Sequence, residues 1–300
     1  MKMKKLTALL LCVLMLIPML AACGSSDAAA ETTAAPKETA TVQGTEGAVA
    51  YAEDVQAIID RGVLRVGVKN AVLGFGFQDE LTGEYSGMEI SLAEKIAEYL
   101  GVEVEFTAVT AATRTELLDS GDIDCVLATF TITEERKKSW DFTTPYYTDY
   151  VTVLVENASG IAGLADLVDK KVGVSSGSTS AKALVKAMVE GGFLPGDNFD
   201  PDTFDPATWT EGISFAQYDD YPTISTALSA GEVDAFCVDK SILAVYNTES
   251  RSYIADQFSP QEYGIATTKG SGMSALCEEL ISTWLSDGTI DALISENGIA

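Results

Sequence analysis

Residues 65–68 read RVGV and are repeated as KVGV at residues 171–174. A second motif, SGDID at residues 120–124, returns as AGEVD at residues 230–234. Each copy has the pattern of a buried strand, a helix, and a second strand behind an acidic corner. We therefore expect two similar α/β lobes with a cleft between them, because ligands of open α/β sheets bind beyond the carboxyl ends of the strands.

The N-terminus has the composition of an export signal. Three lysines precede an apolar run over residues 6–20, and small residues then lead to Cys23. This arrangement resembles the lipobox of bacterial lipoproteins, in which the cysteine becomes the first residue and carries lipid; the alternative is an ordinary signal peptide with an incidental cysteine. We expect a lipoprotein signal peptide over residues 1–22 and an anchor at Cys23 on the outer face of the cell membrane, extracellular or periplasmic.

The composition then divides the chain further. Residues 23–50 are mostly Ala, Thr, Ser, Gly and Glu without an aromatic residue, which predicts a flexible tether. We assign residues 51–149 and 261–300 to lobe 1 and residues 150–260 to lobe 2. The chain would then cross between the lobes near Tyr150 and again over residues 263–267.

The charge and the missing residue types exclude several functions. The net charge of −26 argues against nucleic-acid binding, which requires a basic surface. The chain contains no His, so a Ser-His-Asp or Cys-His nucleophile in its usual form is excluded. No Gly-rich phosphate loop follows either VGV strand. Cys125 and Cys237 lie in apolar strands and are expected to be buried thiols. We expect no metal, no cofactor and a monomer.

Hydrophobic periodicity predicts the remaining elements. Thr133 and the two acids after it also predict the start of a short helix. Residues 191–212 read as a loop rich in Pro, Gly and Asp. Residues 69–87 read as a loop and hairpin. Strands are predicted at 62–68, 102–109, 123–128, 151–155, 172–174 and 233–238, and helices at 90–100, 113–120, 181–189, 223–230, 241–246, 274–285 and 290–295.

Polar residues follow three of these strands. Thr129, Thr131 and Arg136 come after the second strand of lobe 1, where a guanidinium can bind a carboxylate through two parallel hydrogen bonds. The alternative is a surface arginine paired with Glu134 or Glu135.

Ser178, Thr179 and Ser180 open a helix in lobe 2, and a helix N-terminus binds anions readily. Asp239 follows the second strand of lobe 2 and could bind an ammonium group. The alternative for both is plain helix capping. Together these groups match a zwitterion held between the lobes.

Several motifs in the same order resemble the extracellular solute-binding proteins of family 3, which deliver polar amino acids to ABC transporters. The resemblance implies that Arg136 binds the α-carboxylate with help from Thr131 and Thr179. It also implies that Asp239 binds the α-amino group and that the Thr129 backbone adds a contact. The motifs lie at residues 62–68, 87–93, 131–136, 141–146, 172–179 and 231–239.

The sequence departs from the family pattern near the ligand. Residues 72–73 are Val-Leu where many members place an aromatic residue over the ligand, and Phe75 or Phe130 could replace that packing. Members selective for glutamate or aspartate have cations near the positions of Lys69 and Arg114, which would then face the side chain of the ligand. The alternatives are that Lys69 is solvated and that Arg114 pairs with nearby acids, Glu116 or Asp119.

We therefore expect a lipid-anchored protein that binds an amino acid, acidic in character, closes its cleft, and delivers the ligand to the permease of an ABC-type importer. A polar neutral or basic amino acid is an alternative ligand. An enzyme on the same fold, similar to a dehydratase with Asp239 and an acid such as Glu89 in acid–base roles, is a second alternative. A sensor domain is a third.

Overall fold

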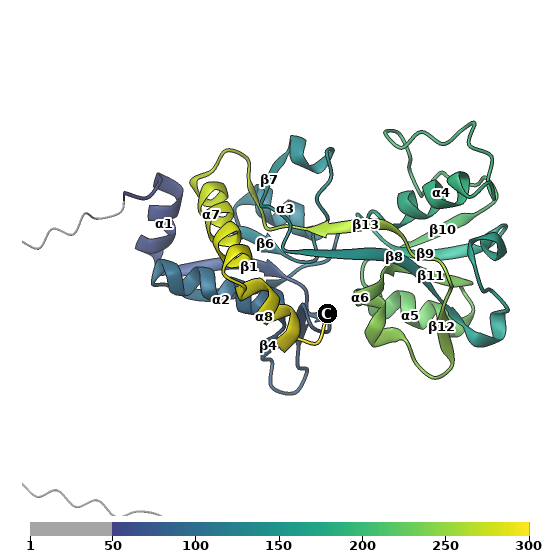
Figure 1. Cartoon of the computed structure of the whole chain (residues 1–300), viewed down its shortest axis with the longest axis horizontal. Helices are drawn as coiled ribbons and strands as arrows, with labels where there is room; N and C mark the ends of the chain where they lie inside the picture. Colours follow the sequence, from purple (N-terminus) through teal and green to yellow (C-terminus); the bar gives the residue numbers. More distant parts are fainter. Residues whose placement is uncertain (1–49, 300) are drawn as a thin grey trace, which may run out of the picture. The chain divides into compact units, whose positions relative to one another are not determined.

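The computed structural model describes residues 50–299, and these residues form two lobes, each built on its own β-sheet (Figure 1). The sheet of lobe 1 has the strand order β5-β1-β6-β14-β7. Strand β1 pairs in parallel with β5 and β6, so the carboxyl ends of these three strands lie at the same edge. The strands are β1 (Val63–Val68), β5 (Glu103–Ala108), β6 (Cys125–Leu127), β7 (Trp140–Phe142) and β14 (Ala266–Thr268).

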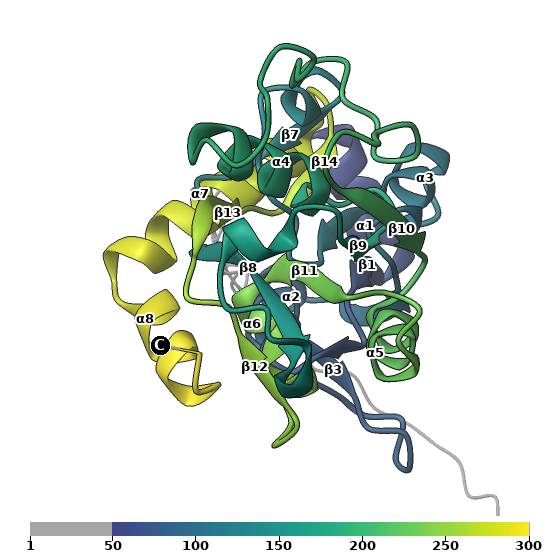
Figure 2. The same cartoon turned by 90° about the vertical axis from the view of Figure 1, so that its right-hand side faces the viewer.

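The sheet of lobe 2 has the order β10-β9-β11-β8-β12, and β13 also pairs with β8. Strand β9 is parallel to β10 and β11, so lobe 2 repeats the parallel arrangement of lobe 1. Figure 2 looks at this sheet from the side of lobe 2, with α4 and α5 on opposite faces. The strands are β8 (Tyr147–Glu156), β9 (Lys171–Ser175), β10 (Ser214–Tyr218), β11 (Ala235–Asp239), β12 (Arg251–Tyr253) and β13 (Phe258–Tyr263).

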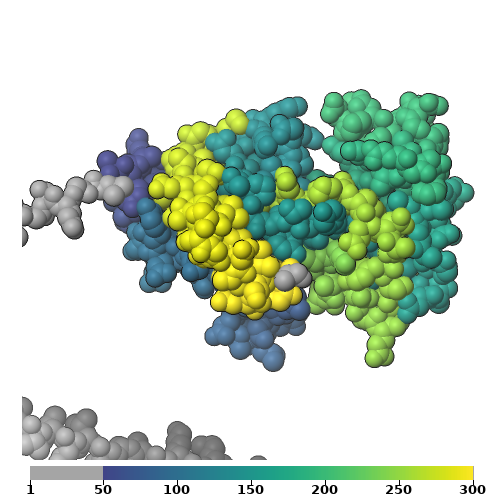
Figure 3. Space-filling model, viewed as in Figure 1, coloured from purple at the N-terminus to yellow at the C-terminus, as the bar shows by residue number. Residues whose placement is uncertain are grey.

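Helices cover both sheets, and Figure 3 shows α7 and α8 (yellow) across one face of lobe 1. No helix of residues 50–299 is long and apolar enough to span a membrane. Lobe 1 contains α1 (Glu53–Arg61), α2 (Met88–Leu100), α3 (Thr113–Ser120), α7 (Gly272–Ser286) and α8 (Thr289–Glu296). Lobe 2 contains α4 (Ser180–Glu190), α5 (Tyr221–Ala230) and α6 (Lys240–Leu243). The short 3-10 helices are η1 (Arg136–Lys138), η2 (Asn157–Ser159), η3 (Leu164–Leu167) and η4 (Ala244–Tyr246).

The repeated motifs meet in space within each lobe. A Cβ atom on Gly67 of β1 would lie 2.6 Å from Cδ1 of Ile123, which belongs to the SGDID corner. In lobe 2, a Cβ atom on Gly173 would lie 3.3 Å from Cγ2 of Val233, in the AGEVD corner. Each glycine therefore lets the corner residue pack directly onto the strand.

Two antiparallel strands, β8 and β13, run side by side between the lobes (Figure 1). Tyr147 lies opposite Tyr263 in this pair, and Asp149 lies opposite Gln261. The predicted lobe boundaries, after residue 149 and before residue 261, fall inside these strands and stay a prediction. The return crossing predicted at residues 263–267 is wrong, because β13 ends at Tyr263 and β14 already pairs with β6 in lobe 1.

Most predicted strands and helices are present with small differences at their ends. Helix α1 was not predicted, because only Val55 and Ile58 of its residues are buried. The edge strand β10 was missed because none of its residues is fully buried. The helix expected to open at Thr133 is replaced by a turn and the short helix η1.

The region predicted as a loop and hairpin forms a small three-stranded sheet in the order β2-β3-β4. Cys125 and Cys237 are buried free thiols, as predicted, and so is Cys277. The predicted signal peptide, Cys23 and nearly all of the predicted tether lie outside the described residues. The strands of the small sheet are β2 (Ala71–Val72), β3 (Gly76–Gln78) and β4 (Tyr85–Ser86).

Candidate functional site

The segments that follow the parallel strands of both lobes line two cavities, which share Ala111 and Tyr221 in their walls. We call the cavity that Arg136 and Asp239 line the small cavity, and the cavity that Lys69 lines, of about 550 Å³, the large cavity. Eight of the predicted site residues line the small cavity. Its lining comprises Ala111, Arg114, Thr129, Thr131, Arg136, Ser178, Thr179, Ser180, Tyr221, Val238 and Asp239.

Arg136, at the start of η1, reaches from lobe 1 to lobe 2. Its Nη1 donates to the Thr131 carbonyl oxygen at 2.7 Å, and its Nη2 donates to the Gly177 carbonyl oxygen at 3.0 Å. Burial, and secondarily the nearby Arg114, lower the pKa of Arg136 to about 9. Both contacts are to neutral oxygens, so the guanidinium charge has no anionic partner among residues 50–299.

The alternative in which Arg136 pairs with Glu134 or Glu135 is wrong. Glu134 binds Lys137 at 2.9 Å, between Nζ and Oε1. Glu135 binds Lys182 of lobe 2 at 3.2 Å, between Nζ and Oε2. Neither acid lines the small cavity, whereas Arg136 does.

Arg114, in the first turn of α3, is a second buried guanidinium at this site. Its Nη1 donates to the Ala128 carbonyl oxygen at 2.9 Å, while its Nε has no hydrogen-bond partner among residues 50–299. Burial lowers its pKa to about 10. The predicted alternative of a pair with Glu116 or Asp119 is wrong, since Arg114 forms no such ion pair in this part of the chain.

The Phe130 ring lies close to both guanidinium groups. Its centroid is 3.7 Å from Cζ of Arg114 and 4.7 Å from Cζ of Arg136, which are cation–π distances. Phe130 lines a third cavity that shares Arg136, Ser178 and Thr179 with the small cavity. The ring therefore supports the two arginines and does not form a wall of the small cavity.

The hydroxyl-rich turn before α4 faces Arg136 from lobe 2. The side chains of Ser178 and Ser180 are buried, and their Oγ atoms have no partner among the described residues. Thr129 Oγ1, in lobe 1, is also buried and has no hydrogen-bond partner among the described residues. Thr179 occupies the N-cap position without a capping bond and instead donates to Gln261 Oε1 at 2.7 Å. Plain helix capping therefore does not explain these hydroxyls.

Asp239 ends β11 and supplies the negative charge of the small cavity. It makes no capping bond to α6, so the alternative of a helix cap is wrong. Its Oδ2 accepts a hydrogen bond from the Tyr263 hydroxyl at 2.6 Å. Burial and the nearby Asp149 raise the pKa of Asp239 to about 7, although Tyr263 and the two arginines lower it.

Thr129 has a backbone φ of +45°, which is rare for a residue with a side chain. Its N–H donates to Glu89 Oε1 at 2.6 Å, and the same oxygen accepts from the Tyr146 hydroxyl at 2.6 Å. Glu89 is fully buried and lines none of the three cavities. It therefore holds the strained turn, which argues against the acid–base role considered for it.

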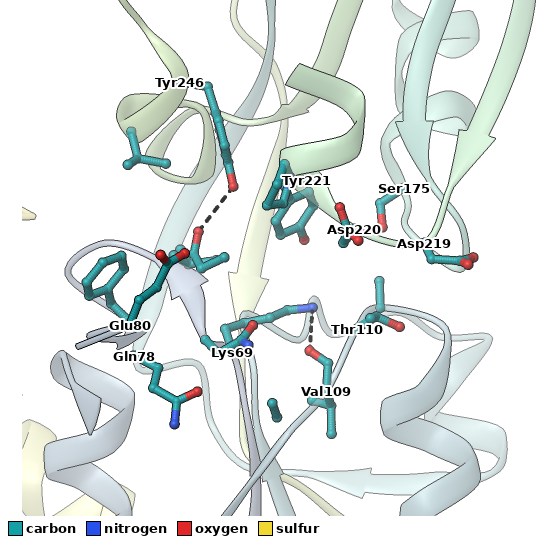
Figure 4. Close-up of a pocket in the computed structure, with 18 residues that line it drawn as sticks. Lys69, Gln78, Glu80, Val109, Thr110, Ser175, Asp219, Asp220, Tyr221 and Tyr246 are labelled. Carbon is teal, nitrogen blue, oxygen red and sulfur yellow. Dashed lines mark hydrogen bonds between the residues drawn. The ribbon is translucent and has the colours of Figure 1, made fainter. Parts of the chain in front are cut away.

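Lys69, directly after β1, lines the large cavity (Figure 4). It is 3% exposed, its Nζ lies 3.4 Å from the Val109 carbonyl oxygen, and Nζ is 5.3 Å from the centre of the Tyr221 ring. Burial lowers its pKa well below the ordinary value, and Arg114 lowers it further. The alternative of a solvated lysine is therefore wrong. Arg114 does not line this cavity, so the two predicted specificity residues occupy different parts of the site.

Two aromatic residues differ from expectation. Phe75 is fully buried and packs edge-on against Tyr147 and Tyr263, at centroid distances of 4.9 and 5.7 Å. It lines none of the cavities, so its predicted contact with a ligand is wrong. Tyr221, at the start of α5, lines both the small and the large cavity and was missed. The acids before it, Asp219 and Asp220, were a sign of a helix start that could have drawn attention to it.

A comparison with known families agrees with this geometry. Residues 64–297 match the model of the bacterial extracellular solute-binding proteins, family 3. The chain belongs to this family. Members of the family are extracellular or periplasmic, and the predicted two-lobed α/β fold of the type II periplasmic binding proteins is confirmed.

The similar proteins are amino-acid-binding proteins. The ABC transporter glutamine-binding protein GlnH of Bacillus subtilis is 32% identical, over 97% of this chain and 96% of that protein. The L-cystine-binding protein TcyJ of Escherichia coli K12 is 31% identical, over 78% and 82% of the two chains. An ancestral arginine-binding protein solved with arginine is 33% identical with a TM-score of 0.65, over 79% of this chain and 98% of that one.

Proposed function

We propose that this protein binds an extracellular amino acid with an acidic side chain, such as glutamate or aspartate, and presents it to the permease of an ABC-type importer. One observation supports the proposal that the ligand is an amino acid. Lobe 1 brings Arg136 and lobe 2 brings Asp239 to one small cavity, and neither side chain forms an ion pair among residues 50–299. A zwitterion supplies both missing charges, because buried charges require partners.

The roles of the other groups follow from their positions. Arg136 and Arg114 carry the positive charge and both lie close to the Phe130 ring, and Ser178 and Ser180 line the same cavity. These groups would bind the α-carboxylate. Asp239 would bind the α-ammonium group, with the strained turn at Thr129 beside it. The side chain of the ligand would then extend into the large cavity.

Lys69 supports the proposal that the ligand has an acidic side chain. Three buried or partly buried cations, Lys69, Arg114 and Arg136, line the two cavities. The acids that line them are the buried Asp239 and the exposed Glu80, Asp219 and Asp220 of the large cavity. An α-carboxylate and an α-ammonium group leave Lys69 without an anion, and a side-chain carboxylate would supply it. Since the whole chain carries a net charge of −26, only such local cations in a poorly hydrated cleft can favour an anionic ligand.

The similar proteins leave the side chain open, because their names state glutamine, cystine and arginine. What these ligands share is the amino-acid head group, which fits the small cavity. They differ in the side chain, which the large cavity would hold. The choice among ligands therefore depends on Lys69 and its neighbours.

The test is the ratio of acid to amide affinity, measured by calorimetry for glutamate against glutamine and for aspartate against asparagine. We expect the wild type to prefer the acids and Lys69→Met to reduce that preference about tenfold or more, since a charged hydrogen bond contributes about 1.5–3 kcal/mol. Lys182→Met is the matched control, because Lys182 pairs with Glu135 and should leave the ratio unchanged. A wild type that prefers a neutral or basic amino acid would refute the acidic ligand and leave the amino-acid site standing.

Anchoring and cleft closure complete the proposal. Cys23 would carry lipid, and Cys23→Ser should release the protein from membranes; unchanged partitioning into detergent would disprove the anchor. The lobes would close on the ligand about β8 and β13, since cleft closure is a common response to ligand in proteins of this kind. A smaller radius of gyration in X-ray scattering with saturating ligand is expected, and an identical radius would contradict closure.

A further inference from the structure

The carboxylate of Asp239 is held by the two strands that connect the lobes. Tyr263, on β13, donates its hydroxyl to Asp239 Oδ2 at 2.6 Å, and the same oxygen of Tyr263 lies 3.3 Å from Asp149 Oδ2, on β8. Asp149 also accepts from the Ser241 N–H at 3.0 Å and from the Ser241 hydroxyl. Asp239, Asp149 and Tyr263 are 4%, 6% and 0% exposed, so water screens this group poorly.

A hydroxyl carries one hydrogen, and the shorter distance shows that it is directed at Asp239. The Asp149 carboxyl group therefore lies close to Asp239 and accepts its own hydrogen bonds from Ser241. Tyr263 thus favours the ionised form of Asp239, because a hydrogen bond to a carboxylate stabilises its charge. Asp149 disfavours the ionised form, because a second carboxylate repels that charge.

We propose that Tyr263 and Asp149 are positioning residues for Asp239 and that together they set the pH below which the protein loses its ligand. The inference rests on the proposed function, in which Asp239 binds the ammonium group of the ligand. It goes beyond that function because neither residue lines the small cavity or the large cavity.

The sign of the pH dependence follows from the groups around Asp239. Tyr263 from β13, Arg114 from α3 and Arg136 from η1 lower its pKa, whereas burial and Asp149 from β8 raise it, to about 7. Tyr221 from α5, Lys69 after β1 and Cys237 within β11 are further titratable groups that interact with Asp239. Only the ionised carboxylate attracts an ammonium group, so affinity should fall about tenfold for each pH unit below the midpoint.

The experiment measures affinity for glutamate between pH 5 and pH 9, at about one-unit steps, by calorimetry on folded variants. Tyr263→Phe removes the hydrogen bond and should move the midpoint up by about one pH unit or more. Asp149→Asn removes the repelling charge and should move it down. Tyr147→Phe is the matched control: its ring stacks on Tyr263 at 5.9 Å, but its hydroxyl donates to the Ile299 carbonyl oxygen. That control should leave the midpoint unchanged.

Opposite shifts in the two variants would support the inference, because a merely structural loss weakens binding at every pH without moving the midpoint. If Asp149→Asn does not fold, the carboxyl carbon-13 signal of Asp239 in Tyr263→Phe and in wild type provides the same comparison. Unshifted midpoints, together with weak binding by Asp239→Asn, would overturn this inference alone. Near-native binding of several amino acids by Asp239→Asn would instead remove Asp239 from the site and overturn the proposed function as well.

Discussion

The corner acids of the two lobes, Asp124 and Asp234, hold the same backbone position. Asp124 Oδ2 accepts from the Arg65 N–H at 2.8 Å, and Asp234 Oδ2 accepts from the Lys171 N–H at 2.8 Å. In both lobes the acid thereby fixes the residue that directly precedes the Val-Gly-Val segment. The internal repeat of the sequence is therefore a repeat of backbone contacts.

The lobes differ at the carboxyl ends of the repeated strands. Strand β1 leads to Lys69 and β6 leads to Thr129, beside the two arginines, whereas β11 ends with Asp239. Lobe 1 thus contributes the positive charges and lobe 2 the negative one. The comparison shows that a duplicated scaffold can carry opposite charges at the strand ends of its two copies, because the strand ends are free to change while strands and corners are constrained by packing.

The largest effect is expected from removing one charge from each lobe. Arg136→Ala and Asp239→Ala should each weaken amino-acid binding by about 2–5 kcal/mol, because truncating one partner leaves the other charge buried and unpaired. That cost corresponds to tens to thousands of fold in the dissociation constant. Calorimetry on variants with native circular dichroism measures it.

The control for this pair is Arg136→Lys, which keeps the charge. It should restore binding only partly, since an ammonium group cannot reproduce the two directed bonds to Thr131 and Gly177. Near-native affinity of Arg136→Ala with a severe loss in Asp239→Ala would show that the lobes do not share recognition in the way proposed.

A smaller effect, on stability alone, is expected from the repeated glycines. Gly173→Ala should cost about 1–3 kcal/mol, because its new Cβ would lie 2.6 Å from Cγ2 of Ile224, which is fixed at the branch of that side chain. Gly67→Ala should cost less, since its close neighbour is Cδ1 of Ile123, the movable end of the side chain. Denaturant unfolding measures both, and a larger cost at Gly67 would contradict the packing comparison.

The smallest effect is expected from the corner acids. Asp124 binds the guanidinium groups of Arg61 and Arg65 in addition to the backbone, whereas Asp234 is exposed and binds only the Lys171 N–H among the described residues. Asp124→Ala should therefore cost about 1–2 kcal/mol and Asp234→Ala about 0.5–1 kcal/mol. The difference should shrink in high salt, which screens the exposed arginines. Equal costs at all salt concentrations would show that the ion pairs contribute nothing.

Local patterns in the sequence were sufficient for the architecture. The repeated VGV and acidic-corner motifs predicted two α/β lobes, and periodicity located helices such as α2, whose Ile90, Leu92 and Ile96 are buried. The polar residues after the strands also predicted that Arg136 and Asp239 would face the same cleft, because ligands of open α/β sheets bind beyond the carboxyl ends of the strands. These inferences depend only on neighbouring residues and on general rules of sheet geometry.

Contacts between distant residues were decided by the tertiary structure. The bond from Tyr263 to Asp239, the support of Thr129 by Glu89, and the place of Phe75 in the core have no periodic signal along the chain. No signal in the sequence showed that Lys69 and Arg114 line different cavities, because both follow strands of lobe 1. Their surroundings differ in the aromatic ring that packs on each, which is Tyr221 for Lys69 and Phe130 for Arg114. The sequence by itself determined which charges reach the cleft; the three-dimensional packing decided which neighbours hold each charge, because those neighbours come from strands and helices that are remote in sequence.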